Sequence, residues 1–90
     1  MVEVRLPTML RVDAEGSAVV ETAGATVGEV LEELATRFPA LGAKILSDDG
    51  SLHRFVNVYV NDDDVRYLDK LDTALAAGDV VSILPAVAGG

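Results

Sequence analysis

The stretch TVGEVLEELATRFP, residues 26–39, carries the clearest helix signal in the chain. Thr26 and Glu29 fit a capping box, in which a threonine and a glutamate three residues later each satisfy a free amide at a helix N-terminus. Pro39 disfavours the helical conformation at the residue before it. The sequence therefore predicts an amphipathic helix over about residues 27–37. Its apolar residues recur at the spacing of one helix face: Val27, Val30, Leu31, Leu34, Ala35 and Phe38.

Two strand patterns precede this helix. Residues 2–6 alternate apolar and charged side chains, as a half-buried strand does. Residues 13–16 (DAEG) have turn chemistry, and residues 17–22 (SAVVET) read as a second strand. We therefore expect an N-terminal β-hairpin.

The chain after the helix begins with residues 39–53, which we expect to be irregular. FVNVYV, residues 55–60, is the clearest strand, because it is dense in β-branched and aromatic residues. Residues 65–67 are expected to form a short return strand, residues 71–77 to hold one short helical turn, and residues 80–84 to form the last strand before Pro85 stops it.

This order of elements predicts an α+β fold, with a mixed sheet packed on one main helix. The first and last strands are expected to be parallel neighbours at the centre of the sheet. Ninety residues suffice for one domain. We assign residues 1–85 to that domain and residues 86–90 to a flexible C-terminal tail.

The composition bears on the class of partner. The net charge is −8, which argues against nucleic acid, because binding phosphates requires clustered Lys and Arg. There is no cysteine, so disulfides, thiolate metal sites and a cysteine nucleophile are all excluded. No signal-peptide pattern or run of 18 apolar residues is present, so we expect a cytoplasmic protein that does not enter the membrane.

Side chains that suggest catalytic or metal sites have simpler interpretations. His53 has no second His or Cys, so it makes a poor metal ligand, and we expect it to be structural or at the surface. The acids at residues 62–64 and 48–49 lack the alternation and the terminal Glu of a calcium loop, so we expect solvated turns. We predict no catalytic residue and no metal site in this chain.

The sequence ends in Gly89-Gly90 a few residues after Pro85. Glycine has no Cβ, so such a tail fits a narrow channel and is suited to carry its carboxylate into another protein's active site. If Val56, Val58, Val81 and Ile83 point to the core, Phe55, Tyr59 and Leu84 lie on the other face of the sheet, where exposed apolar residues mark a partner surface.

Three stretches carry a resemblance to a known family. Residues 78–90 (GDVVSILPAVAGG) match the ending GD-x-V-x-I-x-P-x-V-x-GG, supported by residues 52–61 (LHRFVNVYVN) and residues 6–11 (LPTMLR). On these residues the chain resembles the ubiquitin-like sulfur-carrier proteins of the MoaD/ThiS type. It looks most like the cysteine-biosynthesis carriers, the CysO-like branch of that family.

The resemblance implies the β-grasp, or ubiquitin-like, fold and a carrier that is not itself an enzyme. An E1-like enzyme, in some cases fused to a rhodanese-type domain, uses ATP to adenylate Gly90. A sulfur donor then converts the adenylate into a thiocarboxylate. The tail residues Ala86, Val87, Ala88 and Gly89 would insert into the partner enzymes. Phe55, Tyr59 and Leu84 would help to dock them.

For the cysteine branch, the resemblance implies two further partners. A pyridoxal-phosphate-dependent synthase that uses O-phosphoserine would accept the sulfur, and a zinc metalloprotease would release cysteine from Gly90. The chain itself binds no cofactor in this scheme. ATP, pyridoxal phosphate and zinc belong to the partners.

Three alternatives stay open at this point. The first is a sulfur acceptor in the synthesis of molybdopterin, thiamine or a thiolated secondary metabolite. The Gly-Gly end also suits a ubiquitin-like modifier that forms isopeptide bonds with lysines, or a small subunit whose tail stays inserted in a catalytic subunit. We expect a monomer when the chain is free.

Overall fold

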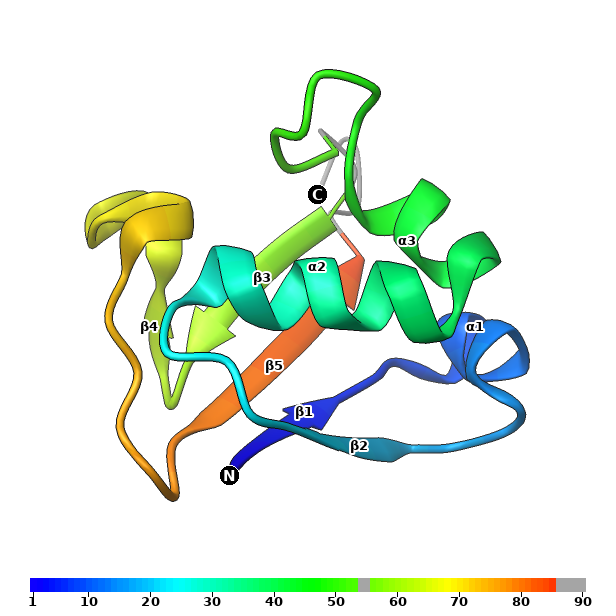
Figure 1. The fold of residues 1–90 in the computed structure, drawn as a ribbon, viewed down its shortest axis with the longest axis horizontal. Helices are drawn as coiled ribbons and strands as arrows, with labels where there is room; N and C mark the ends of the chain where they lie inside the picture. Colours follow the sequence, from blue (N-terminus) through cyan, green and yellow to red (C-terminus); the bar gives the residue numbers. More distant parts are fainter. Residues whose placement is uncertain (54–55, 86–90) are drawn as a thin grey trace.

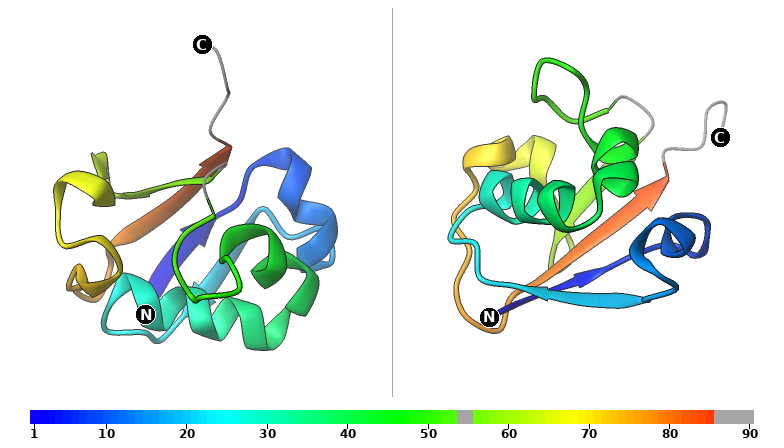
Figure 2. Two further views of the ribbon diagram at one scale, coloured as in Figure 1. Left: turned by 90° about the horizontal axis from the view of Figure 1, so that it is seen from above. Right: turned by 45° about the vertical axis from the view of Figure 1, so that its right-hand side comes forward.

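The computed structural model describes residues 1–53 and 56–85 of the chain. It contains a five-stranded mixed sheet in the order β2-β1-β5-β3-β4. Helices α2 and α3 lie across one face of this sheet, and the short helix α1 lies at one end of it (Figure 1; Figure 2). The predicted α+β class, with a mixed sheet packed on one main helix, is confirmed.

The N-terminal hairpin is confirmed, but its connection is longer than a turn. Strand β1 (Val2–Arg5) pairs antiparallel with β2 (Val19–Thr22). Between them lie helix α1 (Thr8–Arg11) and the 3₁₀ helix η1 (Val12–Ala14), which the sequence analysis did not predict. Glu15 and Gly16 then reverse the chain with φ values of 58° and 83°. The turn predicted at residues 13–16 is therefore present at Glu15 and Gly16. Helix α1 could not be predicted, because four residues are too few to show a periodic pattern.

Helix α2 spans Val27–Arg37, the predicted range. The Thr26 hydroxyl accepts a hydrogen bond from the Glu29 amide at 3.2 Å, as a capping box requires. The Glu29 carboxylate accepts the amide of Ala25 instead of that of Thr26, at 3.1 Å. Both contacts satisfy amides at the start of α2. The predicted apolar face is buried at Val27, Val30, Leu31 and Leu34.

The expectation that residues 39–53 are irregular is wrong for the first half of that segment. Helix α3 occupies Pro39–Ile45, with Pro39 in its first turn. Proline is favoured there, because its fixed φ suits the helix and its missing amide has no helical partner anyway. Leu41 and Ile45 are fully buried, so α3 closes the core at one end of the sheet.

The return strand after β3 (Val56–Val60) is also placed differently from the prediction. Asp63–Asp64 form the two-residue strand β4, which pairs with Tyr59 and Val60. Residues 65–67 are the 3₁₀ helix η2 (Val65–Tyr67), because the Asp64 carboxylate accepts the Arg66 amide and caps this turn. The expected helical turn is present as η3, at Lys70–Asp72, one residue earlier than predicted.

Strand β5 (Val80–Pro85) lies at the centre of the sheet, parallel to β1 and antiparallel to β3. The predicted parallel pairing of the first and last strands is confirmed. Pro85 does not stop the strand but forms its last pair, with Val56. Because Asn61 donates its amide to Val80 at the other end and bonded pairs alternate, Val56 and Pro85 form a non-hydrogen-bonded pair, which needs no proline amide.

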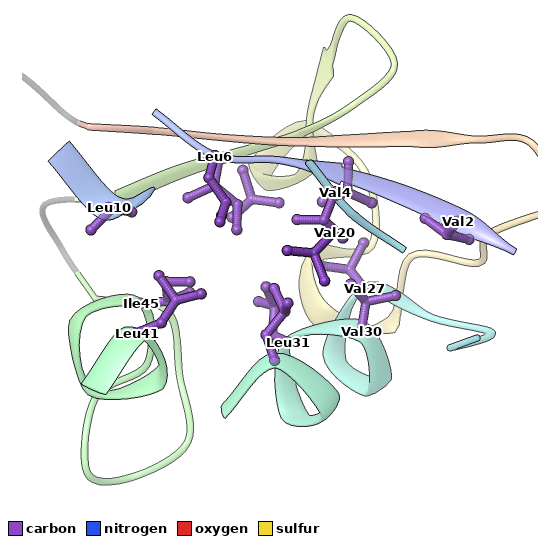
Figure 3. Packing of buried hydrophobic residues seen from close by; sticks show 14 of the residues in the cluster. Val2, Val4, Leu6, Leu10, Val20, Val27, Val30, Leu31, Leu41 and Ile45 are labelled. Atoms are coloured by element: carbon purple, nitrogen blue, oxygen red, sulfur yellow. The ribbon is translucent and has the colours of Figure 1, made fainter. Parts of the chain in front are cut away.

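The core lies between the sheet and the helices. Figure 3 shows Leu31 of α2 and Ile45 of α3 pointing toward the sheet, with Leu10 of α1 near Leu41 and Ile45. The predicted inward residues of β3 and β5 are buried at Val58, Val60, Val81 and Ile83, and half-buried at Val56. No helix in residues 1–53 and 56–85 combines the length and the apolar character that crossing a membrane requires.

Candidate functional site

The candidate site lies where β5 ends. Pro85 is the last described residue, so Gly90 and the predicted insertion segment Ala86, Val87, Ala88 and Gly89 lie outside the described residues. Up to Pro85, the central strand is held by β1 on one side and by β3 on the other. The base of the predicted tail is therefore fixed by the middle of the sheet.

Two of the three predicted docking residues lie on the face of the sheet turned away from the core. Leu84 is 44% exposed and pairs with Asn57 across the sheet, while Tyr59, half-buried, pairs with Ser82. Directly paired residues share a face, so Tyr59 and Leu84 are diagonal neighbours on the same face. Phe55, the third residue, lies outside the described residues.

Asn57 adds a polar feature to this face that the sequence analysis did not single out. Its side-chain oxygen Oδ1 is buried and accepts no hydrogen bond within residues 1–53 and 56–85. A buried carbonyl without a donor costs free energy of about 1–3 kcal/mol. Asn57 pairs with Leu84 across the sheet.

Charged side chains flank the same face at both ends. Arg5 and Glu3 of β1 form an ion pair at 2.6 Å. At the other edge, Arg66 contacts the Asp64 carboxylate at 2.8 Å. The hydrogen bond from the Arg66 guanidinium lowers the pKa of Asp64, although burial opposes this shift. The same bond raises the pKa of Arg66. Asp64 is thus held as an anion, and its charge is compensated locally.

The structure also forms grooves that the sequence analysis missed. One, of about 350 Å³, lies at the end of β5 and is lined by Met9, Ala43, Lys44, Val56 and Pro85 among others. A second, of about 400 Å³, lies on the other side of Val56, against η3. Each groove combines segments far apart in the chain, so no local pattern could have revealed it.

His53 lies between these two grooves and lines both of them. Its backbone amide donates to the Ile45 carbonyl at 2.7 Å, and its carbonyl accepts the Val56 amide at 3.0 Å. These bonds tie the end of α3 to the start of β3. Across the described parts of the chain, no group of three His, Cys, Asp or Glu side chains is placed to hold a metal ion.

Comparison with known proteins finds similarity along the whole chain. The profile of the ThiS family matches residues 4–90. The sulfur carrier protein CysO of Mycobacterium tuberculosis is 47% identical over 91 residues, covering 99% of this chain and 98% of that protein. The small archaeal modifier protein 1 of Haloferax volcanii is 36% identical and covers 100% of this chain and 91% of that protein.

Solved structures agree with these matches. CysO in the crystal structure of the Amycolatopsis orientalis BexX/CysO complex superimposes with a TM-score of 0.90 at 44% identity, covering 100% of both chains. The crystal structure of Mycobacterium tuberculosis CysO gives 0.89 at 45% identity, covering 97% of this chain and 100% of that one. The resemblance inferred from residues 6–11, 52–61 and 78–90 and the predicted β-grasp fold are thereby confirmed.

Proposed function

The chain belongs to the ThiS family of ubiquitin-like sulfur carriers, and from this premise we propose that it carries sulfur as a thiocarboxylate on Gly90 for cysteine biosynthesis. The observation that carries the proposal is the similarity to CysO over nearly the full length of both proteins, together with a family profile that reaches Gly90. The chain acts in this scheme as a co-substrate, and the catalytic residues belong to the enzymes that it visits.

The fold supports this role through the position of Pro85. The strand before it is the central one of the sheet, so the domain holds the base of the tail from both sides. The five residues that follow span at most about 17 Å when extended. Gly90 can therefore enter an active site about that far below the surface of a partner, while the domain remains outside.

The activation chemistry begins at the Gly90 carboxylate. An oxygen of that carboxylate attacks the α-phosphorus of ATP on an E1-like enzyme, and pyrophosphate leaves. Sulfide then attacks the acyl carbon and displaces AMP, which leaves a thiocarboxylate on Gly90. With a persulfide donor the same attack gives an acyl disulfide, and a second thiol of the donor enzyme cleaves its S–S bond, which releases the thiocarboxylate and leaves a disulfide on that enzyme. Because the chain has no cysteine, the thiocarboxylate is its only ionisable sulfur nucleophile.

The delivery chemistry uses a different partner. The thiocarboxylate sulfur adds to an aminoacrylate that a pyridoxal-phosphate synthase forms from O-phosphoserine. The new amino group then attacks the thioester, so that cysteine becomes amide-linked to Gly90. A zinc metalloprotease hydrolyses that amide and returns the free carboxylate. ATP, pyridoxal phosphate and zinc all act on the partners, and this chain supplies the tail and the docking surface.

Docking is assigned to the outer face of the sheet. Tyr59 and Leu84 supply apolar area beside the base of the tail, and Phe55 is proposed to extend it.

The experiment uses the thiocarboxylated chain with the O-phosphoserine-dependent synthase and its substrate. The proposal predicts an intact mass higher than that of the thiocarboxylated chain by one aminoacrylate, which equals one cysteine residue above the unmodified chain, and release of cysteine when the metalloprotease is added. The chain lacking Gly90 is the control and should gain nothing. If the synthase is active with free sulfide but forms no adduct with the thiocarboxylated chain, the cysteine assignment is wrong.

A second candidate is a ubiquitin-like modifier, or a carrier for molybdopterin, thiamine or a thiolated secondary metabolite. The observation in favour of a modifier is the 36% identity to a small archaeal modifier protein, with a crystal structure at a TM-score of 0.78. Isopeptide-linked ladders on lysines in a cell lysate would support this reading. Free thiocarboxylate without such ladders would exclude it.

A further inference from the structure

The groove at the end of β5 lies on the opposite side of that strand from Tyr59 and Leu84. Met9 and Leu10 of α1 line one wall, Ala43 and Lys44 of α3 line the other, and His53, Val56 and Pro85 complete it. Its volume is about 350 Å³. The two walls come from α1 and α3, whose buried residues Leu10, Leu41 and Ile45 belong to one apolar cluster (Figure 3).

Met9 is a large apolar residue that stays exposed although its neighbour in the sequence belongs to the core. It is 61% exposed, whereas the neighbouring Leu10 is 7% exposed and belongs to the core. A flexible thioether side chain adapts its shape to different apolar partners. The base of the groove therefore has a fixed apolar floor at Leu10 and an adaptable apolar edge at Met9.

Lys44 gives the groove a cationic edge. Its ammonium contacts the Asp13 carboxylate at 2.5 Å, and its side chain remains 52% exposed. The side chain of Asp13 is only 15% exposed, so it contacts the ammonium from the protein side. The rest of the Lys44 side chain remains open to solvent. A second carboxylate that approaches from outside would meet this exposed part of the ammonium.

The position of Pro85 identifies the occupant. Pro85 lines the groove and is also the last residue before the five-residue tail. Because that tail spans at most about 17 Å, any enzyme that acts on Gly90 must bring its surface close to Pro85. An interface of usual size covers about 800 Å² on each partner, which is much more than Tyr59 and Leu84 offer. The enzyme surface must therefore extend around the base of the tail.

We propose that this groove receives an apolar side chain, flanked by a carboxylate, from the E1-like enzyme that adenylates Gly90. The apolar side chain packs between Met9 and Val56, and the carboxylate pairs with Lys44. The proposal rests on the function proposed above. It adds a second docking surface, so that the enzyme contacts the end of β5 on both faces of the sheet.

The test measures ATP–pyrophosphate exchange by the E1-like enzyme of the same organism, with this chain as the varied substrate. Met9→Asp should raise the KM for the chain at least about tenfold and leave kcat unchanged, because it acts on docking only. Val12→Asp is the matched control. Val12 is 75% exposed in the following turn and does not line the groove, so its KM should stay within about twofold of that of the unaltered chain.

A pair of charge reversals tests the cationic edge. Lys44→Glu should raise the KM by several-fold, and this effect should shrink at high salt. Lys70→Glu makes the same change at the other groove and should have no such effect. Thermal unfolding of each variant shows whether its fold is retained. If Met9→Asp and Lys44→Glu match their controls, the proposal is overturned.

Other occupants give different results. The methyl NMR signal of Met9 in the free chain would move on deletion of residues 86–90 if the tail of the same chain fills the groove. It would move with protein concentration if a second copy does. Either result overturns the proposal. If the unaltered chain gives no exchange at all with an enzyme that is active on another carrier, the proposed function fails, and this docking site fails with it.

Discussion

Gly42 sets the distance between α3 and α2, and Gly42→Ala tests that packing. A Cβ added at Gly42 would lie 2.6 Å from the Cα of Ala35, against 3.4–4 Å for ordinary van der Waals contact. The atom in the way belongs to the backbone of α2, so the conflict cannot be relieved by a side-chain rotation. Helix α3 must move away by about 1 Å, which loosens the packing of Leu41 and Ile45.

The size of the effect follows from two opposing terms. Overpacking a core by one methyl group costs about 1–3 kcal/mol. Alanine is favoured over glycine inside a helix by about 1 kcal/mol. The free energy of unfolding should therefore fall by up to about 2 kcal/mol, which lowers the Tm of a domain of this size by up to about 15 °C. Circular dichroism during heating measures the Tm, and urea titration measures the free energy.

The compensating change is Ala35→Gly, which removes the nearer obstacle, the Ala35 Cβ at 2.4 Å, and leaves the Cα at 2.6 Å. The double variant should therefore recover part of the stability that Gly42→Ala loses, beyond what the two single changes predict by addition. An increase in Tm for Gly42→Ala, or a double variant whose loss is the sum of the single losses, would refute the close approach of the two helices.

Three further predictions concern stability and the tail. The Thr22 hydroxyl is buried and has no hydrogen-bond partner within the described residues, so Thr22→Val should raise the free energy of unfolding by about 1 kcal/mol; a lower urea midpoint would contradict this. The Arg66 guanidinium lowers the pKa of Asp64, so this carboxylate stabilises the fold above its unfolded pKa of about 4, and the stability is lost as the pH falls through the lower folded value. Asp64→Asn should thus destabilise the chain at neutral pH and have a much smaller effect in acid; a difference in urea midpoint that is independent of pH would contradict this. Deletion of Gly90 should abolish thiocarboxylate formation with no change in Tm, and transfer that persists in this truncation would contradict the role of Gly90.

The sequence predicts the elements that have a strong repeated signal. The buried face of α2 is predicted from the spacing of apolar residues over about three helical turns. A hydrogen bond between Thr26 and Glu29 marks the start of the helix. Strand β3 is read from its β-branched and aromatic residues, of which Val58 and Val60 prove to be buried. These signals are local, so they can be recognised without knowledge of the tertiary structure.

The missed elements are short or depend on contacts across the fold. Pro39 was read as a stop, and it does end α2, but it also begins α3. Helix α3 has only seven residues, and it is held by Leu41 and Ile45 against the core more than by its own propensity. Strand β4 has two residues, and only its pairing with Tyr59 and Val60 identifies it.

The candidate site likewise has features that the sequence predicts and features that only the tertiary structure reveals. The Gly89-Gly90 ending and the position of Leu84 are readable from a strand pattern followed by a motif. The groove between Met9, Lys44 and Pro85 is not, because it forms only when α1 and α3 pack beside the end of β5. The buried oxygen of Asn57 is likewise visible only when the sheet is assembled.

The measurement that tests the central claim most directly is the intact mass of the purified chain after incubation with its E1-like enzyme, ATP and a sulfide source. The account predicts an increase equal to the replacement of one oxygen by sulfur, located at Gly90 by fragmentation and absent when ATP is omitted. An unchanged mass, with the same enzyme shown to be active on another carrier, would contradict the account.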